Sequence, residues 1–181
     1  MKIDHARRIA SGIIRQLQPY TERIDIAGSI RRNCTVVTDI EIVCIPKRIA
    51  QTHDMFGNEI HDSYIRHPGF KKVVDQWVKV HGDAQNGKMM TRMIPLDYPA
   101  IPEPSVQLDI FTATIDSWGY IMVIRTGSAD YSKEIATDWR RAGYHGDEGN
   151  LWDEGNNLIK VPTEETLFEL IGRPYEPPHL R

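Results

Sequence analysis

Two acidic residues, Asp39 and Glu41, lie one residue apart in an otherwise apolar segment. Side chains alternate between the two faces of a β-strand, so both carboxylates would point the same way, about 6.6 Å apart along the backbone. Two carboxylates this close on one face repel each other unless a positive charge sits between them. A divalent cation is the usual solution, and the alternative is an edge strand with two solvated acids.

A third acid, Asp109, occupies a second segment with alternating apolar residues, 105–112. The apolar residues at its even positions would face a core, so Asp109 would point to the opposite face. A single acid on a strand is usually a solvated surface carboxylate, but here two further acids lie on an earlier strand. Together, Asp39, Glu41 and Asp109 provide enough oxygen ligands for a pair of Mg²⁺ ions, because magnesium keeps several of its waters.

A candidate phosphate cradle precedes the acid pair, where Gly28 and Ser29 follow a short apolar segment and open a helical turn. Backbone N–H groups at such a turn, together with a serine hydroxyl, suit phosphate oxygens. Arg32 could bind the same phosphates with a two-pronged guanidinium, whereas Arg31 is more typical of a solvated or structural arginine. A phosphate cradle beside a metal pair indicates phosphoryl or nucleotidyl transfer.

Apolar periodicity predicts the helices that must support these residues. Helical spacing over 4–18, with Asp4 as a cap and Pro19 at its end, predicts an amphipathic first helix. Further helices are expected at 70–80, 117–124, 130–142 and 164–171, the last capped by Thr163. The expected buried face of the helix at 70–80 consists of Phe70, Val73, Val74, Trp77 and Val80.

Strands and loops are expected between these helices. The predicted strands are about 23–27, 38–45, 88–94 and 105–112, with short strands joined by turns beyond residue 144. Residues 47–69 and the proline-rich 95–104 are expected to be loops. The irregular spacing of the three histidines in the first loop favours a surface over a metal site; these are His53, His61 and His67. The acid-bearing strands precede residue 118, which predicts a domain at 1–118 and a smaller one at 119–181.

The composition limits the kind of protein this can be. The net charge of the 181 residues is −3, positive by one over 1–118 and negative by four over 119–181, which argues against nucleic-acid binding by overall charge alone. Cys34 and Cys44 imply no disulfide framework. No segment resembles a signal peptide or a membrane span. We therefore expect a cytoplasmic protein (host cytoplasm if viral or phage) that is neither secreted nor bound to a membrane.

The order of Gly-Ser, acid-x-acid and a distant strand acid resembles the polymerase β-like nucleotidyltransferase superfamily. The second half is similar to the C-terminal subdomain of family X DNA polymerases, through Arg125–Ala129, Arg140–Tyr144, Leu151–Glu165 and Leu170–Pro177. In size and layout the chain resembles the minimal viral family X polymerases, which lack lyase and helix-hairpin-helix domains. The resemblance implies an α+β fold: a nucleotidyltransferase palm, with a mixed sheet and helices on one face, plus a small α+β C-terminal (nucleotide-binding, thumb) subdomain.

The resemblance also implies roles for individual residues. Asp39 and Glu41 would bind two Mg²⁺ ions, for which Mn²⁺ could substitute, and Asp109 would bind the catalytic ion beside the primer 3′-hydroxyl. The β- and γ-phosphates of the nucleoside triphosphate would be held by Gly28, Ser29 and Arg32. The bend under the sugar of that nucleotide would be formed by Thr126, Gly127 and Ser128.

Several positions depart from the family pattern. Glu41 stands where family X polymerases have Asp, so the metal spacing is expected to differ. Ile124 and Arg125 replace the Tyr-Phe pair that senses the sugar, which weakens the expectation of deoxyribonucleotide selectivity. Ala129 and Ala136 replace larger residues that contact nucleotide and template. Nucleotidyl transfer is therefore predicted more firmly than template dependence.

The leading hypothesis is a monomeric DNA polymerase that adds nucleotides to the primer 3′-hydroxyl of primer–template or gapped DNA, as in short-gap repair. A second hypothesis is a template-independent or ribonucleotide-tolerant nucleotidyltransferase, for which the substrate could be an RNA end. A third, from another class, is a catalytically inactive nucleotide-binding module. The presence of Asp109 counts against the third hypothesis, because a protein that only binds nucleotides does not need this acid.

Overall fold

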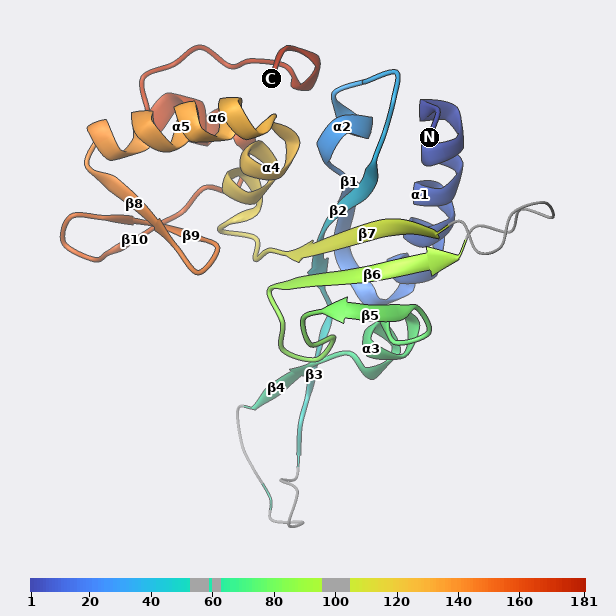
Figure 1. Cartoon of the computed structure of the whole chain (residues 1–181). Helices are drawn as coiled ribbons and strands as arrows, with labels where there is room; N and C mark the ends of the chain where they lie inside the picture. Colours follow the sequence, from blue (N-terminus) through green and yellow to red (C-terminus); the bar gives the residue numbers. More distant parts are fainter. Residues whose placement is uncertain (53–58, 60–62, 96–104) are drawn as a thin grey trace.

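The computed structural model describes residues 1–52, 59, 63–95 and 105–181 of the chain (Figure 1). Its helices are α1 (Ile3–Leu17), α2 (Gly28–Arg31), α3 (Pro68–Val74), α4 (Trp118–Thr126), α5 (Ala129–Arg141) and α6 (Glu164–Leu170), with 3₁₀ turns at Gln18–Tyr20 and Pro178–Leu180. Its longer strands are β1 (Thr21–Ile26), β2 (Asp39–Pro46), β6 (Met89–Pro95) and β7 (Ser105–Thr112). The shorter ones are β3 (Arg48–Ala50), β4 (Tyr64–Arg66), β5 (Val78–His81), β8 (Tyr144–Asp147), β9 (Asn150–Asp153) and β10 (Leu158–Ile159).

A mixed five-stranded sheet forms the first half, in the order β1-β2-β7-β6-β5. Only β2 and β7 run parallel among these neighbours; the other three pairs are antiparallel. Helices α1 and α3 cover one face of this sheet, where apolar side chains of both helices join those of the central strands in one buried cluster. The α+β class and the mixed sheet predicted from the sequence are therefore present.

Helix α1 matches its predicted range to within one residue at each end, but its predicted cap is wrong. The helix begins at Ile3, and the residue before it, Lys2, makes no side-chain capping bond. Asp4 lies inside the first turn, where its negative charge interacts favourably with the positive end of the helix dipole but makes no capping hydrogen bond. The buried stripe responsible for packing consists of Ala6, Ala10, Ile13 and Leu17.

The predicted helix at 70–80 is wrong in its second half. Helix α3 ends at Val74, and Val78–His81 instead form β5, the edge strand beside β6. Val80, expected on the buried face of that helix, is 58% exposed, and its neighbour Val78 is 62% exposed. Two β-branched residues alternating with polar ones suit a strand, and the pairing with β6 satisfies backbone groups that a free segment would leave to water.

The predicted loop at 47–69 contains more structure than expected. β3 and β4 form a two-stranded antiparallel ribbon, and the first turn of α3 already includes Pro68 and Gly69. His67 caps this helix, since its Nδ1 accepts a hydrogen bond from the backbone N–H of Gly69 at 3.0 Å. The other two histidines of this loop and residues 96–104 lie outside the described residues.

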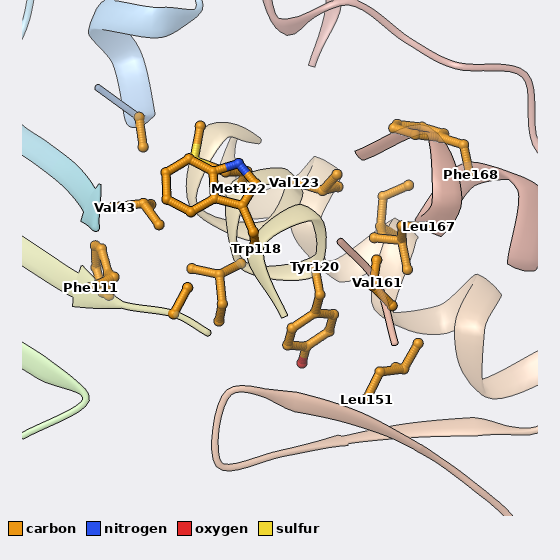
Figure 2. Packing of buried hydrophobic residues seen from close by; sticks show 14 of the residues in the cluster. Val43, Phe111, Trp118, Tyr120, Met122, Val123, Leu151, Val161, Leu167 and Phe168 are labelled. Carbon is orange, nitrogen blue, oxygen red and sulfur yellow. The ribbon is translucent and has the colours of Figure 1, made fainter. Parts of the chain in front are cut away.

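The C-terminal half packs α4, α5 and α6 around a second core, with a three-stranded sheet in the order β10-β9-β8 (Figures 1 and 2). This core extends across the predicted boundary at residue 118. Val43 of β2 and Phe111 of β7 belong to the same buried cluster as Trp118 and Met122 of α4 (Figure 2). Helix α4 thus covers part of the sheet face opposite α1 and α3.

The helices of the described residues include none that is both long enough and apolar enough to span a bilayer. The longest, α1, has 15 residues, of which several are charged and exposed.

Candidate active site

The parallel pairing of β2 and β7 brings the three predicted acids onto one sheet face. Glu41 lies directly opposite Asp109, and Asp39 lies opposite Gln107 on the preceding pair. Neighbouring strands are about 4.8 Å apart, so the Glu41 and Asp109 side chains leave the sheet side by side. The next pair on this face is Val43 and Phe111, which α4 covers. The acids therefore lie on this face just beyond the part that α4 covers, with Asp39 and Glu41 half-buried and Asp109 buried.

Asp109 is the most deeply buried of the three, with 6% of its surface exposed. Its Oδ1 accepts a hydrogen bond from the Thr91 hydroxyl at 2.7 Å, and its Oδ2 accepts one from the Gln107 side-chain amide at 2.9 Å. Both oxygens thus have a donor, which holds the carboxylate in one orientation. Sequence reasoning did not identify Thr91, because its position opposite Asp109 depends on the pairing of β6 with β7.

Glu41 packs against the Gly28 backbone. A Cβ at Gly28 would lie only 1.8 Å from Oε2 of Glu41, and the φ of Gly28 is +60°. Glycine is therefore required twice over, by close approach and by the left-handed backbone. The backbone N–H of Ala27 donates to the Glu41 carbonyl at 2.9 Å, which ties α2 to β2.

The pKa of Glu41 is raised to about 7. Burial is the largest cause, followed by the negative charges of Asp39 and Asp109, while Arg125 and Arg32 partly offset them. The ionised form of this carboxyl is thus disfavoured by its surroundings until a positive charge arrives. Such a shift beside other acids is typical of a functional site.

Asp39 is only partly buried at the start of β2. Its Oδ1 accepts a hydrogen bond from the Thr38 hydroxyl at 2.7 Å. Over the described ranges, no group of three or more His, Cys, Asp or Glu side chains is already arranged as a metal-ligand cluster.

The Gly-Ser turn has a polar atom available for a ligand. The Ser29 hydroxyl is buried and has no hydrogen-bond partner in the described part of the chain. Buried polar atoms nearly always have a partner, so an unpaired hydroxyl in the turn that packs on Glu41 suits a bound oxygen ligand. With Gly28 leaving no side chain in the way, the residues present fit a metal–phosphate group: carboxylate oxygens for Mg²⁺ and a hydroxyl for a phosphate oxygen.

The two arginines after the turn contact the C-terminal half. Nη1 and Nη2 of Arg31 donate to the two carboxylate oxygens of Glu164 at 2.7 and 2.6 Å, and Nη1 also donates to the Thr126 hydroxyl at 2.8 Å. Nη1 of Arg32 donates to the Thr126 carbonyl at 2.5 Å. The interpretation of Arg31 as structural agrees with these bonds. Arg32, predicted to bind phosphate, here ties the Gly-Ser turn to the end of α4.

Glu164 is a second acid whose surroundings sequence reasoning missed. Burial by itself would raise its pKa, but hydrogen bonds from Arg31 and Arg181 and their charges hold the pKa below its ordinary value. Arg181, the last residue, donates from Nη1 to Glu164 Oε1 at 2.6 Å. A sequence can show a glutamate in the first turn of a helix, but not which arginines fold onto it.

The predicted sugar-contacting bend, residues 126–128, forms the junction between α4 and α5. Thr126 is fully buried, and a Cβ at Gly127 would lie 2.6 Å from a ring carbon of Tyr131. The Ser128 hydroxyl caps α5 by accepting a hydrogen bond from the Tyr131 N–H at 3.3 Å. These contacts account for the three residues structurally, and their role toward a nucleotide stays a prediction.

Residues 121–181 match the family model described as DNA polymerase beta thumb. The match covers about a third of the chain, from within α4 to the last residue. None of the curated proteins matches the chain. The expected family X character of the C-terminal subdomain is thus supported, and family X polymerases generally use Mg²⁺. The comparisons lend no support to the minimal viral layout.

Proposed function

We propose that this chain is a Mg²⁺-dependent nucleotidyltransferase of the family X type that extends a primer 3′-hydroxyl with nucleoside triphosphates. One observation carries the proposal: the sheet face that holds Glu41 opposite Asp109 opens at the edge of α4, within the region that matches the polymerase beta thumb. Carboxylates alone suit many metal sites. Their position beside a polymerase-type domain favours nucleotidyl transfer.

The three acids would hold the ions in this proposal. When bound, a pair of ions lowers the pKa of the attacking hydroxyl and stabilises the departing pyrophosphate. Asp109, supported from Thr91 and Gln107, keeps a fixed carboxylate on the β7 side. Glu41 contributes the carboxylate nearest the Gly-Ser turn, and Asp39 completes the set from the partly open end of β2.

The Gly-Ser turn would bind the triphosphate. The unpaired Ser29 hydroxyl is free to donate to a phosphate oxygen. The hydrogen bonds of Arg31 and Arg32 to Thr126 join this turn to the bend between α4 and α5, so that phosphate binding and the position of the bend are coupled. The expected partners are a nucleoside triphosphate and primer–template or gapped DNA, bound by a monomer in short-gap repair.

A second candidate is template-independent or ribonucleotide-tolerant transfer, to a DNA or RNA end. The observation that favours it is at Arg125, which places a guanidinium beside the acids where the family has an aromatic side chain. Ala129 is exposed and Ala136 partly exposed on α5, so neither presents a large side chain to a template. The catalytically inactive module is the third candidate.

A primer-extension assay with labelled DNA and RNA primers separates these candidates. We expect addition of the matched deoxynucleotide opposite each template base with Mg²⁺, and at least a thousandfold loss in Asp109→Asn prepared in the same way. Tailing without a template, or equal use of ribonucleotides, would favour the second candidate. Absence of any addition to any end with Mg²⁺ or Mn²⁺ would overturn both enzymatic proposals.

A further inference from the structure

Arg125 lies at the edge of α4, where the covered and open parts of the acid-bearing face meet. Its guanidinium carbon is 4.0 Å from the centroid of the Phe111 ring. Phe111 is two residues beyond Asp109 on the same face of β7, and Val43, its partner on β2, is buried beneath α4 (Figure 2). Stacking on a buried ring holds the guanidinium in one place.

The charge of Arg125 acts on the acids without an ion pair to any of them. Within the described ranges, no carboxylate lies within ion-pairing distance of Arg125, and its Nε is buried without a hydrogen-bond partner. Burial lowers the pKa of Arg125 from the ordinary value, and the negative charges of Glu41 and Asp109 oppose this shift. Arginine remains a cation under these conditions. A fixed, incompletely compensated positive charge therefore faces the carboxylates.

This arrangement has opposite effects on two kinds of ligand. A divalent ion bound by Glu41 and Asp109 without a nucleotide would meet a like charge, because the guanidinium is held by Phe111 and tied to α4. When a triphosphate binds with the ion, the interaction of Arg125 with the ligand becomes attractive, since the triphosphate oxygens carry several negative charges that attract the guanidinium. The other nearby cation, Arg32, is already engaged with the Thr126 carbonyl.

We infer that Arg125 makes metal binding at Asp39, Glu41 and Asp109 conditional on the triphosphate: it weakens binding of the ion alone and strengthens binding of the ion with nucleotide. This inference rests on the proposed function, because it assigns a charged ligand to the same site. Arg125 would thus favour binding of the ion together with the triphosphate over binding of the ion alone. No contact between Arg125 and the reacting atoms is required.

Metal titration tests the inference without using activity. Mn²⁺ binding is measured by the loss of the free-ion EPR signal, with and without a deoxynucleoside triphosphate that has a non-hydrolysable α,β-methylene bridge. Relative to wild type, we expect Arg125→Met to bind Mn²⁺ alone about tenfold more tightly, a Coulomb effect of moderate size. The tightening that the analogue produces should be about tenfold smaller in Arg125→Met than in wild type. Arg125→Lys should stay near wild type because it keeps the charge.

Arg23→Met is the matched control. The Arg23 guanidinium also lies 4.0 Å from an aromatic centroid, that of Trp118, but Arg23 is exposed and pairs with Ile45, four residues along β2 from Glu41. Its replacement should leave both Mn²⁺ affinities unchanged. Circular dichroism monitors folding of each variant, and Arg125→Gln replaces Arg125→Met if the methionine variant does not fold.

The outcomes separate the two proposals. Unchanged Mn²⁺ affinities in folded Arg125→Met or Arg125→Gln would overturn the inference, while analogue-dependent Mn²⁺ binding by wild type would leave the proposed function standing. Failure of the wild-type protein to bind Mn²⁺ together with the analogue would overturn both. Equal changes in Arg23→Met and Arg125→Met would also overturn the inference, because they would reflect overall charge and not the position of Arg125.

Discussion

Two glutamates in neighbouring regions, the buried Glu164 and the half-buried Glu41, have pKa values shifted in opposite directions. Glu164, in the first turn of α6, has its pKa held below the ordinary value by hydrogen bonds from Arg31 and Arg181. Glu41, on β2, has its pKa raised to about 7 by burial and by two neighbouring acids. The first carboxylate is fully compensated within the chain, whereas the second is not. The difference distinguishes an acid that holds the fold together from one that is suited to a ligand.

The contrast also has a geometric basis. Figure 1 shows the chain end, which carries Arg181, beside α2, and the Arg31–Glu164–Arg181 group joins both to α6. On the sheet face with Glu41, the described residues place no arginine in an ion pair with its carboxylate; Arg125 and Arg32 act on it only through their charges. Compensation of charge thus follows the packing between the two halves of the molecule, and it stops where the open face begins.

The largest expected effect is that of Glu164→Ala. The substitution removes the carboxylate that pairs with the guanidinium groups of Arg31 and Arg181. Removing one member of a buried ion pair lowers the free energy of unfolding by about 3–5 kcal/mol. Because the pKa of Glu164 is lowered, its contribution is present at neutral pH and is lost as pH falls below about 4.5. Urea unfolding at pH 7 and pH 3.5 measures both. An effect below 1 kcal/mol at pH 7 would contradict the assigned role.

Gly28→Ala is expected to cost about 2–3 kcal/mol, because the new methyl group meets the Glu41 carboxylate at a backbone with positive φ. The double variant Gly28→Ala with Glu41→Ala should recover part of this loss, since only the backbone strain remains. A double-mutant cycle measured by thermal unfolding gives the coupling. Simple additivity of the two substitutions would show that Gly28 and Glu41 are not in contact.

Glu41→Gln should have the opposite sign from Glu164→Ala. A carboxyl with a raised pKa in the folded state destabilises the fold as pH rises from about 4.5 through about 7, so removing its charge should stabilise the protein at pH 8 by about 1–2 kcal/mol. At pH 4 the gain should vanish, because the native carboxyl is then protonated. Thermal unfolding across this range, without added divalent ions, checks both limits. Destabilisation at pH 8 would contradict the inferred electrostatics.

The smallest effect is expected at a second ion pair between the two halves. Lys88 donates to the Glu148 carboxylate at 2.8 Å, but their side chains are 55% and 73% exposed. Exposed pairs contribute about 0–1 kcal/mol, so Lys88→Ala should leave the urea midpoint almost unchanged, in contrast to Glu164→Ala. A loss of stability comparable to that of Glu164→Ala would show that the exposure of the Lys88–Glu148 pair does not make it weaker than the buried Arg31–Glu164–Arg181 group.

Local pattern predicted much of the fold. Alternation identified β2 and β7, including the face on which Asp39, Glu41 and Asp109 lie, and helical spacing identified α1 and α5 within one or two residues. The prediction was wrong at β5, where apolar residues consistent with a helix instead form an edge strand. There they pair with the backbone of β6, which would otherwise lack a partner on that side. Short segments of this kind are decided by their neighbours in space.

The sequence by itself determined which side chains share a face, because that depends only on the two-residue period of a strand. It also indicated the family of the C-terminal half, which the match to the polymerase beta thumb supports. Only the tertiary structure decided that Glu41 lies opposite Asp109, that Thr91 donates to Asp109, and that Glu164 meets two arginines. These contacts join residues far apart in the chain. They depend on the strand register and on the packing of the two halves, which the buried core as a whole determines.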